Sequence, residues 1–185
     1  VGEPIALAER AEVQGGIAGL WSLDCARDGP IVYDEADRRP VDVTWYGRDG
    51  RPIKTLFRHP ARLFYAAVSH GGDRVAAIDF GDSGLTLLVA DLTTGTSSRL
   101  TRGDRLPLAV AWTPDDSAVV ASVLDSGKRA IVAFDPRNGS ERTLFPATVR
   151  FMTPSAVAPD GTVLLDELFS GRLNDIVALP RGGSE

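Results

Sequence analysis

Short runs of apolar residues, separated by tight polar turns, occupy most of the chain. In one stretch four such runs follow one another, at residues 63–68, 74–78, 85–90 and 97–101. Glycine, asparagine and aspartate fill the turns between them, and these residues tolerate the positive φ that hairpin turns require. The pattern predicts a four-stranded antiparallel meander.

The same unit occurs four times along the chain. Turns rich in proline, aspartate and glycine end at Gly29, Gly72, Asp116 and Gly161. Their spacings are 43, 44 and 45 residues, and a second set of glycine turns repeats at 45, 44 and 44 residues. A period of about 40 to 45 residues with four strands per unit is typical of β-propeller blades. An immunoglobulin-like sandwich also has many short strands, but nothing in it requires near-identical units.

We therefore predict an all-β protein, a β-propeller of four-stranded antiparallel blades with four blades in this chain. The segments are an outer closing strand at 1–10 and blades at 11–58, 59–102, 103–146 and 147–185. The last blade lacks its fourth strand, and residues 3–8 align with the fourth strand of the blade before it. Because an unpaired edge strand invites aggregation, these residues could complete the last blade and close a four-bladed ring. Otherwise the chain is part of a larger propeller, and its open blade edges would allow self-association.

Several of these segments resemble a known family. Trp-Thr-Pro-Asp-Asp at 112–116 and Ala-Pro-Asp-Gly-Thr at 158–162 are similar to the core of WD40-like (PD40) repeats, the kind found in TolB. Residues 89–95 followed by 99–101 match the second half of that repeat, and 174–177 resemble its third strand. The resemblance implies a TolB-like propeller, for which six blades are the commonest number, and a periplasmic or other extracytoplasmic location in bacteria. It specifies blade architecture and no activity.

Two further segments, at 2–5 and 43–51, resemble the propellers that follow bacterial serine/threonine kinase domains. In those proteins a Val-x-Trp-Val-Asp-Arg-x-Gly-Arg strand introduces the blades, whereas here Tyr46 and Gly47 stand in place of Val-Asp. The resemblance implies association with a kinase. The chain begins at Val1 and not at methionine, so we expect it to be a piece of a longer protein.

Composition narrows the set of partners. The chain has 20 basic and 25 acidic residues, a net charge of -5, which argues against a nucleic acid as the main partner. No apolar run approaches the roughly 18 residues of a membrane helix, so we expect no membrane insertion by this segment. The single cysteine, Cys25, excludes an internal disulfide and is expected to be a buried small hydrophobe.

One end of the predicted propeller collects the irregular loops and the links between blades, where recognition usually resides. Basic side chains gather there, and we predict that they bind a protein or peptide: Arg62, Arg105, Arg150, Arg129, Arg172 and His59. Arginine pairs in bidentate fashion with carboxylates, which favours acidic peptides or a C-terminal carboxylate. The alternative is that these arginines are solvated or pair with neighbouring acids, namely Asp82, Asp104, Asp125 and Glu167.

Apparent catalytic motifs do not assemble into a site. Gly81-Asp82-Ser83-Gly84 resembles the surroundings of a serine-protease nucleophile, but His70 is expected at the opposite end of the blade. Asp79-Phe80-Gly81 repeats the metal-binding tripeptide of kinases, but no glycine-rich loop, strand lysine or His-Arg-Asp segment accompanies it. The aspartates at 115, 116 and 160 lack the calcium-loop pattern, so we expect them to cap their own turns. We predict no catalytic residues, metal or cofactor, and we expect Trp21, Trp45 and Trp112 to pack between blades.

The sequence thus predicts a non-catalytic propeller that binds a protein or peptide, as the sensor or scaffold module of a larger bacterial protein. One alternative is the substrate-screening propeller of a prolyl-oligopeptidase-like serine hydrolase, whose Gly-x-Ser-x-Gly elbow would lie outside this chain. Another is a propeller that binds a sugar or small molecule, which would need an aromatic platform in a polar pocket.

Overall fold

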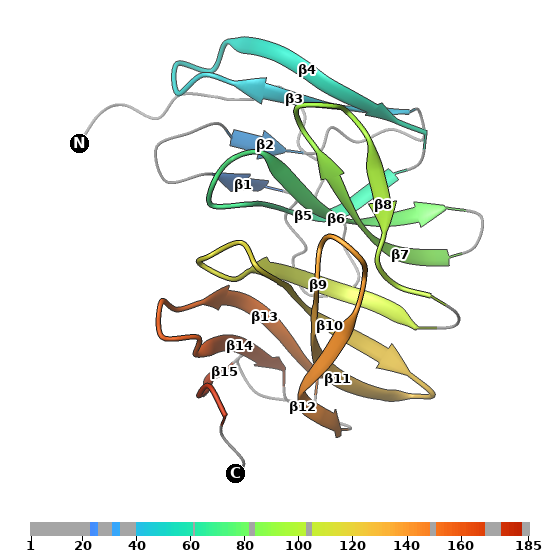
Figure 1. Ribbon diagram of the computed structural model, residues 1–185, viewed down its shortest axis with the longest axis vertical. Helices are drawn as coiled ribbons and strands as arrows, with labels where there is room; N and C mark the ends of the chain where they lie inside the picture. Colours follow the sequence, from blue (N-terminus) through green and yellow to red (C-terminus); the bar gives the residue numbers. More distant parts are fainter. Residues whose placement is uncertain are drawn as a thin grey trace.

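The computed structural model describes residues 23–25, 31–33, 40–60, 62–81, 84–102, 105–148, 151–168 and 175–182. In this part of the chain all regular structure is β, arranged in four antiparallel sheets that we call blades 1 to 4 (Figure 1). Blade 1 comprises β1 (Leu23–Cys25), β2 (Ile31–Tyr33), β3 (Val41–Tyr46) and β4 (Pro52–His59). Blade 2 comprises β5 (Arg62–Val68), β6 (Arg74–Gly81), β7 (Gly84–Asp91) and β8 (Ser97–Arg99). Blade 3 comprises β9 (Leu106–Trp112), β10 (Val119–Asp125), β11 (Lys128–Phe134) and β12 (Glu141–Thr148). Blade 4 comprises β13 (Phe151–Val157), β14 (Val163–Leu168) and β15 (Asp175–Leu179).

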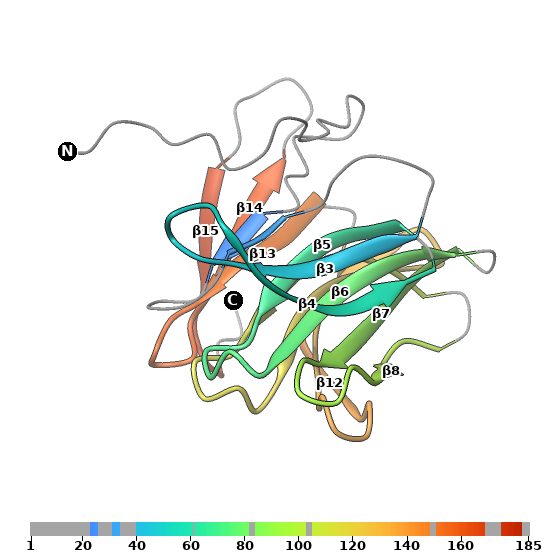
Figure 2. The ribbon, with the colours of Figure 1, turned by 90° about the horizontal axis from the view of Figure 1, so that it is seen from above.

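Each blade is an up-and-down meander, as the sequence predicts. Neighbouring strands in the sheet are also neighbours in the chain, and every pair is antiparallel. Blade 4 has three strands in its described part. The sheets stack face to face along the molecule, and the sheet of blade 4 is turned relative to those of blades 1 and 2 (Figures 1 and 2). This progressive rotation is the arrangement of propeller blades.

The four described blades form an open array and not a closed ring. Inner strand β5 contacts β1 on one side and β9 on the other, and β9 contacts β13 in turn. Blades 1 and 4 lie at opposite ends of this series (Figure 1). The expected alternative of a closed four-bladed ring is therefore wrong for the described blades. The predicted closing strand, residues 3–8, lies outside the described residues.

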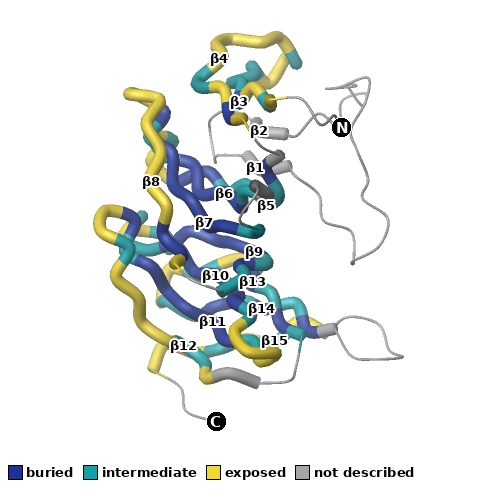
Figure 3. The backbone as a smooth tube through the Cα atoms, turned by 90° about the vertical axis from the view of Figure 1, so that its right-hand side faces the viewer, coloured by how far each residue is buried: buried dark blue, intermediate teal, exposed yellow. Residues whose placement is uncertain are grey.

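The hydrophobic core lies between the blades. In β10, Val119, Ala121 and Val123 belong to the cluster shared with blade 2, while Val120 belongs to the cluster shared with blade 4. Successive side chains of a strand point to opposite faces, so a strand covered on both faces must be apolar at nearly every position. Strands β6, β7, β9, β10 and β11 are accordingly buried for most of their length, inner strand β5 is mostly of intermediate burial, and the outer strands β4, β8 and β12 are largely exposed (Figure 3).

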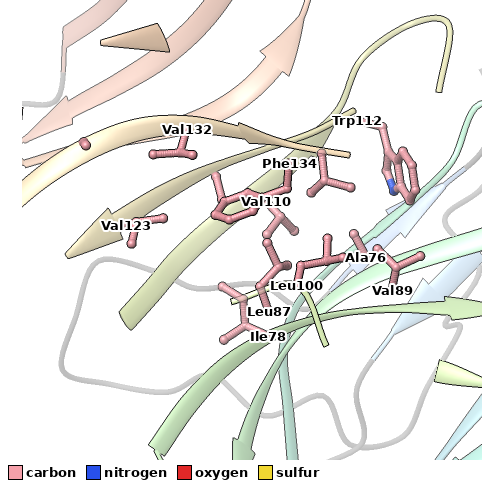
Figure 4. Packing of buried hydrophobic residues seen from close by; sticks show 13 residues of the cluster. Ala76, Ile78, Leu87, Val89, Leu100, Val110, Trp112, Val123, Val132 and Phe134 are labelled. Atoms are coloured by element: carbon pink, nitrogen blue, oxygen red, sulfur yellow. The ribbon is translucent and has the colours of Figure 1, made fainter. Parts of the chain in front are cut away.

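Trp112 fixes the contact between blades 2 and 3. Its side chain is buried in their shared cluster, together with Ala76 and Val89 of blade 2 (Figure 4). The indole Nε1–H donates a hydrogen bond of 2.8 Å to the carbonyl oxygen of Ala67 in blade 2. The guanidinium of Arg74, also in blade 2, lies over the ring at 4.9 Å from its centroid. The expectation that Trp112 packs between blades is confirmed, and Trp45 likewise packs against the cluster between blades 1 and 2. Trp21 lies outside the described residues.

Most turn aspartates cap their own hairpins, as expected. Asp115 accepts hydrogen bonds from the Ser117 amide at 3.1 Å and hydroxyl at 2.7 Å. Asp160 accepts one from the Thr162 amide at 2.8 Å. These local bonds replace solvent at the exposed amides of a tight turn.

Asp116 differs, and for this residue the expectation was wrong. Its carboxylate accepts hydrogen bonds from the backbone amides of His70 at 2.7 Å and Gly71 at 2.8 Å, in the β5–β6 turn of blade 2. Its own carbonyl accepts a bond from Arg74 Nη2 at 3.2 Å. The turns of blades 2 and 3 lie close enough for a short side chain to bridge them, so Asp116 joins two blades instead of capping one turn.

Replacing Asp116 with glycine is expected to lower the free energy of unfolding by about 1–2 kcal/mol. The change removes two charge-assisted bonds and leaves two amides without their acceptor. Glycine also relieves the left-handed conformation of Asp116, at φ 54, which offsets part of the loss. Urea unfolding of wild type and Asp116→Gly measures the difference. Asp175→Ala, at an exposed position of β15, should stay within about 0.5 kcal/mol of wild type; an equal loss in both variants would contradict the bridging role.

Candidate functional site

The hairpin turns that contain Asp116 and Asp160 lie at one end of the blades, and the irregular connections lie at the other, which we call the loop end. The structure describes one complete connection at the loop end, the β10–β11 turn. Ser126 and Gly127 both have positive φ there, at 50° and 80°, and Asp125 pairs with Lys128 across the turn. Such a two-residue turn is rigid, so the residues beside it are held in fixed positions.

Arg105, just before β9, is held by acidic residues of its own blade. Its Nε lies 3.4 Å from Asp125 Oδ2, and its Nη1 forms an ion pair with Glu141. The side chain is 26% exposed. Asp125 is one of the acidic neighbours that the sequence offered as an alternative partner, whereas Glu141 is separated by 36 residues. Two carboxylates therefore compensate the charge of this guanidinium.

Arg129, in β11, has different surroundings. Its guanidinium lies over the ring of Phe151 in β13, 4.1 Å from the centroid, and so spans blades 3 and 4. Its Nε is buried and has no hydrogen-bond partner in the described part of the chain. A cation over an aromatic face is oriented by the ring and keeps its positive charge. Arg129 therefore differs from Arg105, whose charge is compensated by two carboxylates.

Of the other predicted site residues, only His59 has a described side chain. His59 ends β4 and is buried, with 9% of its surface exposed. Arg62 is the first residue of β5, and its backbone pairs with that of Phe80. Its side chain is not among those that the structure describes. Arg150 and Arg172 lie outside the described residues. In the described part of the chain, no two of the predicted binding residues contact each other.

The segments that resemble catalytic motifs remain apart. His70 lies in the β5–β6 turn, while Gly81 and Gly84 flank the far end of β6, which is eight residues long. At about 3.3 Å per residue, β6 separates these ends by roughly 25 Å. Ser83 itself lies outside the described residues. Among those that are described, no group of three His, Cys, Asp or Glu side chains is placed to hold a metal ion.

Tyr65 is the one strained residue of the inner strands in the described part of the chain. It has φ 38 at the point where the β5–β6 register shifts, which marks a β-bulge. Burial raises the pKa of its hydroxyl, and the negative charge of Asp166 in blade 4 raises it further. The hydroxyl therefore stays protonated at neutral pH.

A groove of about 430 Å³ lies between blades 3 and 4, at the end where the hairpin turns lie. Its walls come from the β9–β10 and β13–β14 turns, from β12 and from the end of β15. Apolar side chains such as Val120, Leu144 and Val163 line it together with the arginines 142 and 181. Binding was predicted at the loop end, so this groove was not among the predicted sites.

Asp115 is the acidic residue among those that line the groove. The hydroxyl of Ser117, then its amide, and then the hydroxyl of Thr113 stabilise the carboxylate and lower its pKa from 3.8 to about 2. Asp115 is therefore ionised at every ordinary pH. With Arg142 and Arg181, the groove carries two positive charges and one negative charge, and the negative one is already satisfied by its own turn.

The fold is that of a TolB-like β-propeller. TolB from Acinetobacter baumannii superposes with a TM-score of 0.69 at 19% identity, over 87% of this chain and 41% of that protein. A structure described as TolB from Agrobacterium tumefaciens gives 0.67 at 17% identity, over 89% of this chain and 59% of that one. A structure from an analysis of two prolyl endopeptidases gives 0.64 at 19% identity, over 87% of this chain and 28% of that one.

The chain spans between 28% and 59% of the length of these three proteins. No protein family model matches it, and no curated protein matches it in sequence. At such identities the likeness concerns the fold. The described residues include no helix long and apolar enough to cross a membrane.

Stability should depend on the charge of Asp115 in acid. Because its folded pKa is lowered, the stability that its charge contributes is present above the unfolded pKa near 3.8 and is lost as the pH falls through about 2. Asp115→Asn keeps an acceptor for Ser117 but cannot titrate. Between pH 5 and pH 2, urea midpoints of the wild type are therefore expected to fall further than those of Asp115→Asn. Parallel curves for the two proteins would show that this carboxylate contributes nothing to acid stability.

Proposed function

We propose that the chain is a non-catalytic propeller module that recognises an acidic segment of a protein or peptide, within a larger bacterial protein. The observation that carries the proposal is Arg129, a guanidinium oriented on the ring of Phe151, with a buried Nε that has no hydrogen-bond partner in the described part of the chain. A carboxylate is the group that such a fork receives best, because it accepts two parallel N–H bonds.

The scaffold supports this role. Arg129 is the second residue of β11, close to the rigid two-residue turn of Ser126 and Gly127, and it pairs across the sheet with Leu124, so its backbone is fixed before any ligand arrives. Rigid placement lowers the entropic cost of binding, because the backbone does not have to be ordered when the ligand binds. Arg105, by contrast, already has two carboxylate partners, and a ligand would have to displace them. Sensing or scaffolding by a propeller fits these features, and association with a kinase domain is a further proposal that rests on the sequence resemblance.

Arg129→Ala is expected to weaken binding of aspartate- and glutamate-rich peptides about tenfold relative to wild type. The affinity of Arg129→Lys is expected to lie between those of wild type and Arg129→Ala. Binding of wild type and variants to an array of acidic peptides, and to matched arrays with Asn and Gln instead, measures the effect. Arg137→Ala is the matched control, because Arg137 is exposed in the β11–β12 turn at the other end of the strand. Thermal unfolding shows whether each variant is folded. If Arg129→Ala and wild type retain the same peptides equally, the proposal fails.

A second candidate is the propeller part of a prolyl-oligopeptidase-like hydrolase. The observation that favours it is the structural likeness to a prolyl endopeptidase, of which this chain spans 28%. This function requires an α/β-hydrolase domain with a Gly-x-Ser-x-Gly elbow in the same polypeptide. Reading the complete coding sequence tests it: such a domain would favour the hydrolase, and its absence would rule it out.

A further inference from the structure

The groove between blades 3 and 4 corresponds to a contact that is filled between blades 2 and 3. The turns align through their hydrogen bonds: Gly72, Asp116 and Gly161 each donate an amide bond to the residue three positions earlier. They also each have positive φ. The contact between blades 2 and 3, which we call the first contact, can therefore be compared residue by residue with the contact between blades 3 and 4, which we call the second contact.

Four residues that fill the first contact are replaced in the second. Where the first contact has the indole of Trp112 and the carboxylate of Asp116, the second has Val157 and Gly161. On the facing blade, Ala118 stands where Arg74 stands, and Pro114, which has no amide hydrogen, stands where His70 donates its amide. All four replacements line the groove: Pro114, Ala118, Val157 and Gly161. The groove is thus the space that a ring, a carboxylate and a guanidinium occupy one blade earlier.

The walls retain chemistry suited to the first two of these groups. Val120, Leu144 and Val163 give the floor an apolar surface that a ring can cover. Arg142 and Arg181 are exposed at the rim and supply positive charge. The Arg181 side chain crosses Gly161 so closely that a Cβ there would lie 2.9 Å from its Cδ. The aliphatic stem of Arg181 therefore fills the start of the path that the Asp116 side chain takes between blades 2 and 3, and a bound carboxylate would lie in the groove beside that stem.

We propose that this groove binds an aromatic side chain next to a carboxylate, both presented by a peptide segment of another protein. The ring would take the place of the missing indole, and the carboxylate would face Arg142 and Arg181. A volume of about 430 Å³ lies within the range of roughly 300–1,000 Å³ of ligand sites and exceeds what one side chain fills. The site involves neither Arg129 nor the loop end, so it stands or falls independently of the proposed function.

The chain itself provides the probe. Acetyl-Trp-Thr-Pro-Asp-Asp-amide has the sequence of residues 112–116, which fill the equivalent contact. Titration into the ¹⁵N-labelled protein is expected to shift the amides of Ala118, Val157 and Gly161 in a saturable way. Replacing the tryptophan of the peptide with alanine, or both aspartates with asparagine, should weaken binding about tenfold or more. Absence of saturable shifts at these amides would overturn the proposal.

A variant that fills the groove provides the decisive comparison. Val157→Trp combined with Ala118→Arg restores the pair found at 112 and 74, so binding should be lost while the thermal midpoint stays equal or rises. If this variant does not fold, Arg142→Ala with Arg181→Ala, at exposed positions, should weaken binding about tenfold and reduce its salt dependence. Unchanged affinity in the folded variants would overturn the proposal.

Two further measurements separate this site from others. Arg129→Ala should bind the probe as wild type does, since Arg129 does not line the groove; a loss there would place the peptide at the loop end and overturn the proposal. Indole-3-acetate carries a ring and a carboxylate without a peptide. It should bind at least about tenfold more weakly than the pentapeptide, because it lacks the backbone and second carboxylate; equal or tighter binding would overturn a peptide ligand in favour of a small aromatic acid.

Discussion

Every blade depends on its neighbour to bury its faces. A sheet of four short strands has two apolar faces and no core of its own, so its burial is completed by the next sheet along the array. The alternation in β10 shows this directly, since Val119 faces one neighbour and Val120 faces the other. Trp112 and Asp116 then add directional bonds to Ala67 and to the turn of blade 2, which fix how the two sheets register. Apolar contact supplies the driving force, and these bonds supply the geometry.

Because the contact repeats, individual copies can lose parts of it. The apolar cluster between blades 3 and 4 includes Val120, Ile131, Met152 and Leu165, so these blades stay packed although no side chain there corresponds to Trp112 or Asp116. The positions that differ lie at the end of the contact, near the turns, and not in its middle. A hollow can therefore open at the rim while the centre of the interface remains filled. In a single-core protein the same replacements would create a buried cavity, at a cost that grows with its volume.

The sequence predicts this fold well because its signals are local and repeated. Hairpin turns are encoded by a few residues, and four copies at one period make each copy evidence for the others. Asp115 and Asp160 were predicted correctly because each caps a turn two residues away. Asp116 was not, since its partners lie 46 and 45 residues earlier, in another blade. The groove was not predicted for a related reason: the repeat is defined by the positions that the blades share, whereas the groove arises from positions at which they differ.

Arg105 and Arg129 show why charge along a sequence does not locate a binding site. Both are arginines of blade 3, and both were predicted to bind from their position beside the loops. Folding brings Glu141 from the outer strand to Arg105, whereas it places Arg129 on Phe151 of the next blade. An ion pair neutralises a guanidinium, but a ring orients it and leaves its charge in place. The long-range partner, which no local pattern encodes, therefore decides which of two similar arginines has its charge compensated by carboxylates.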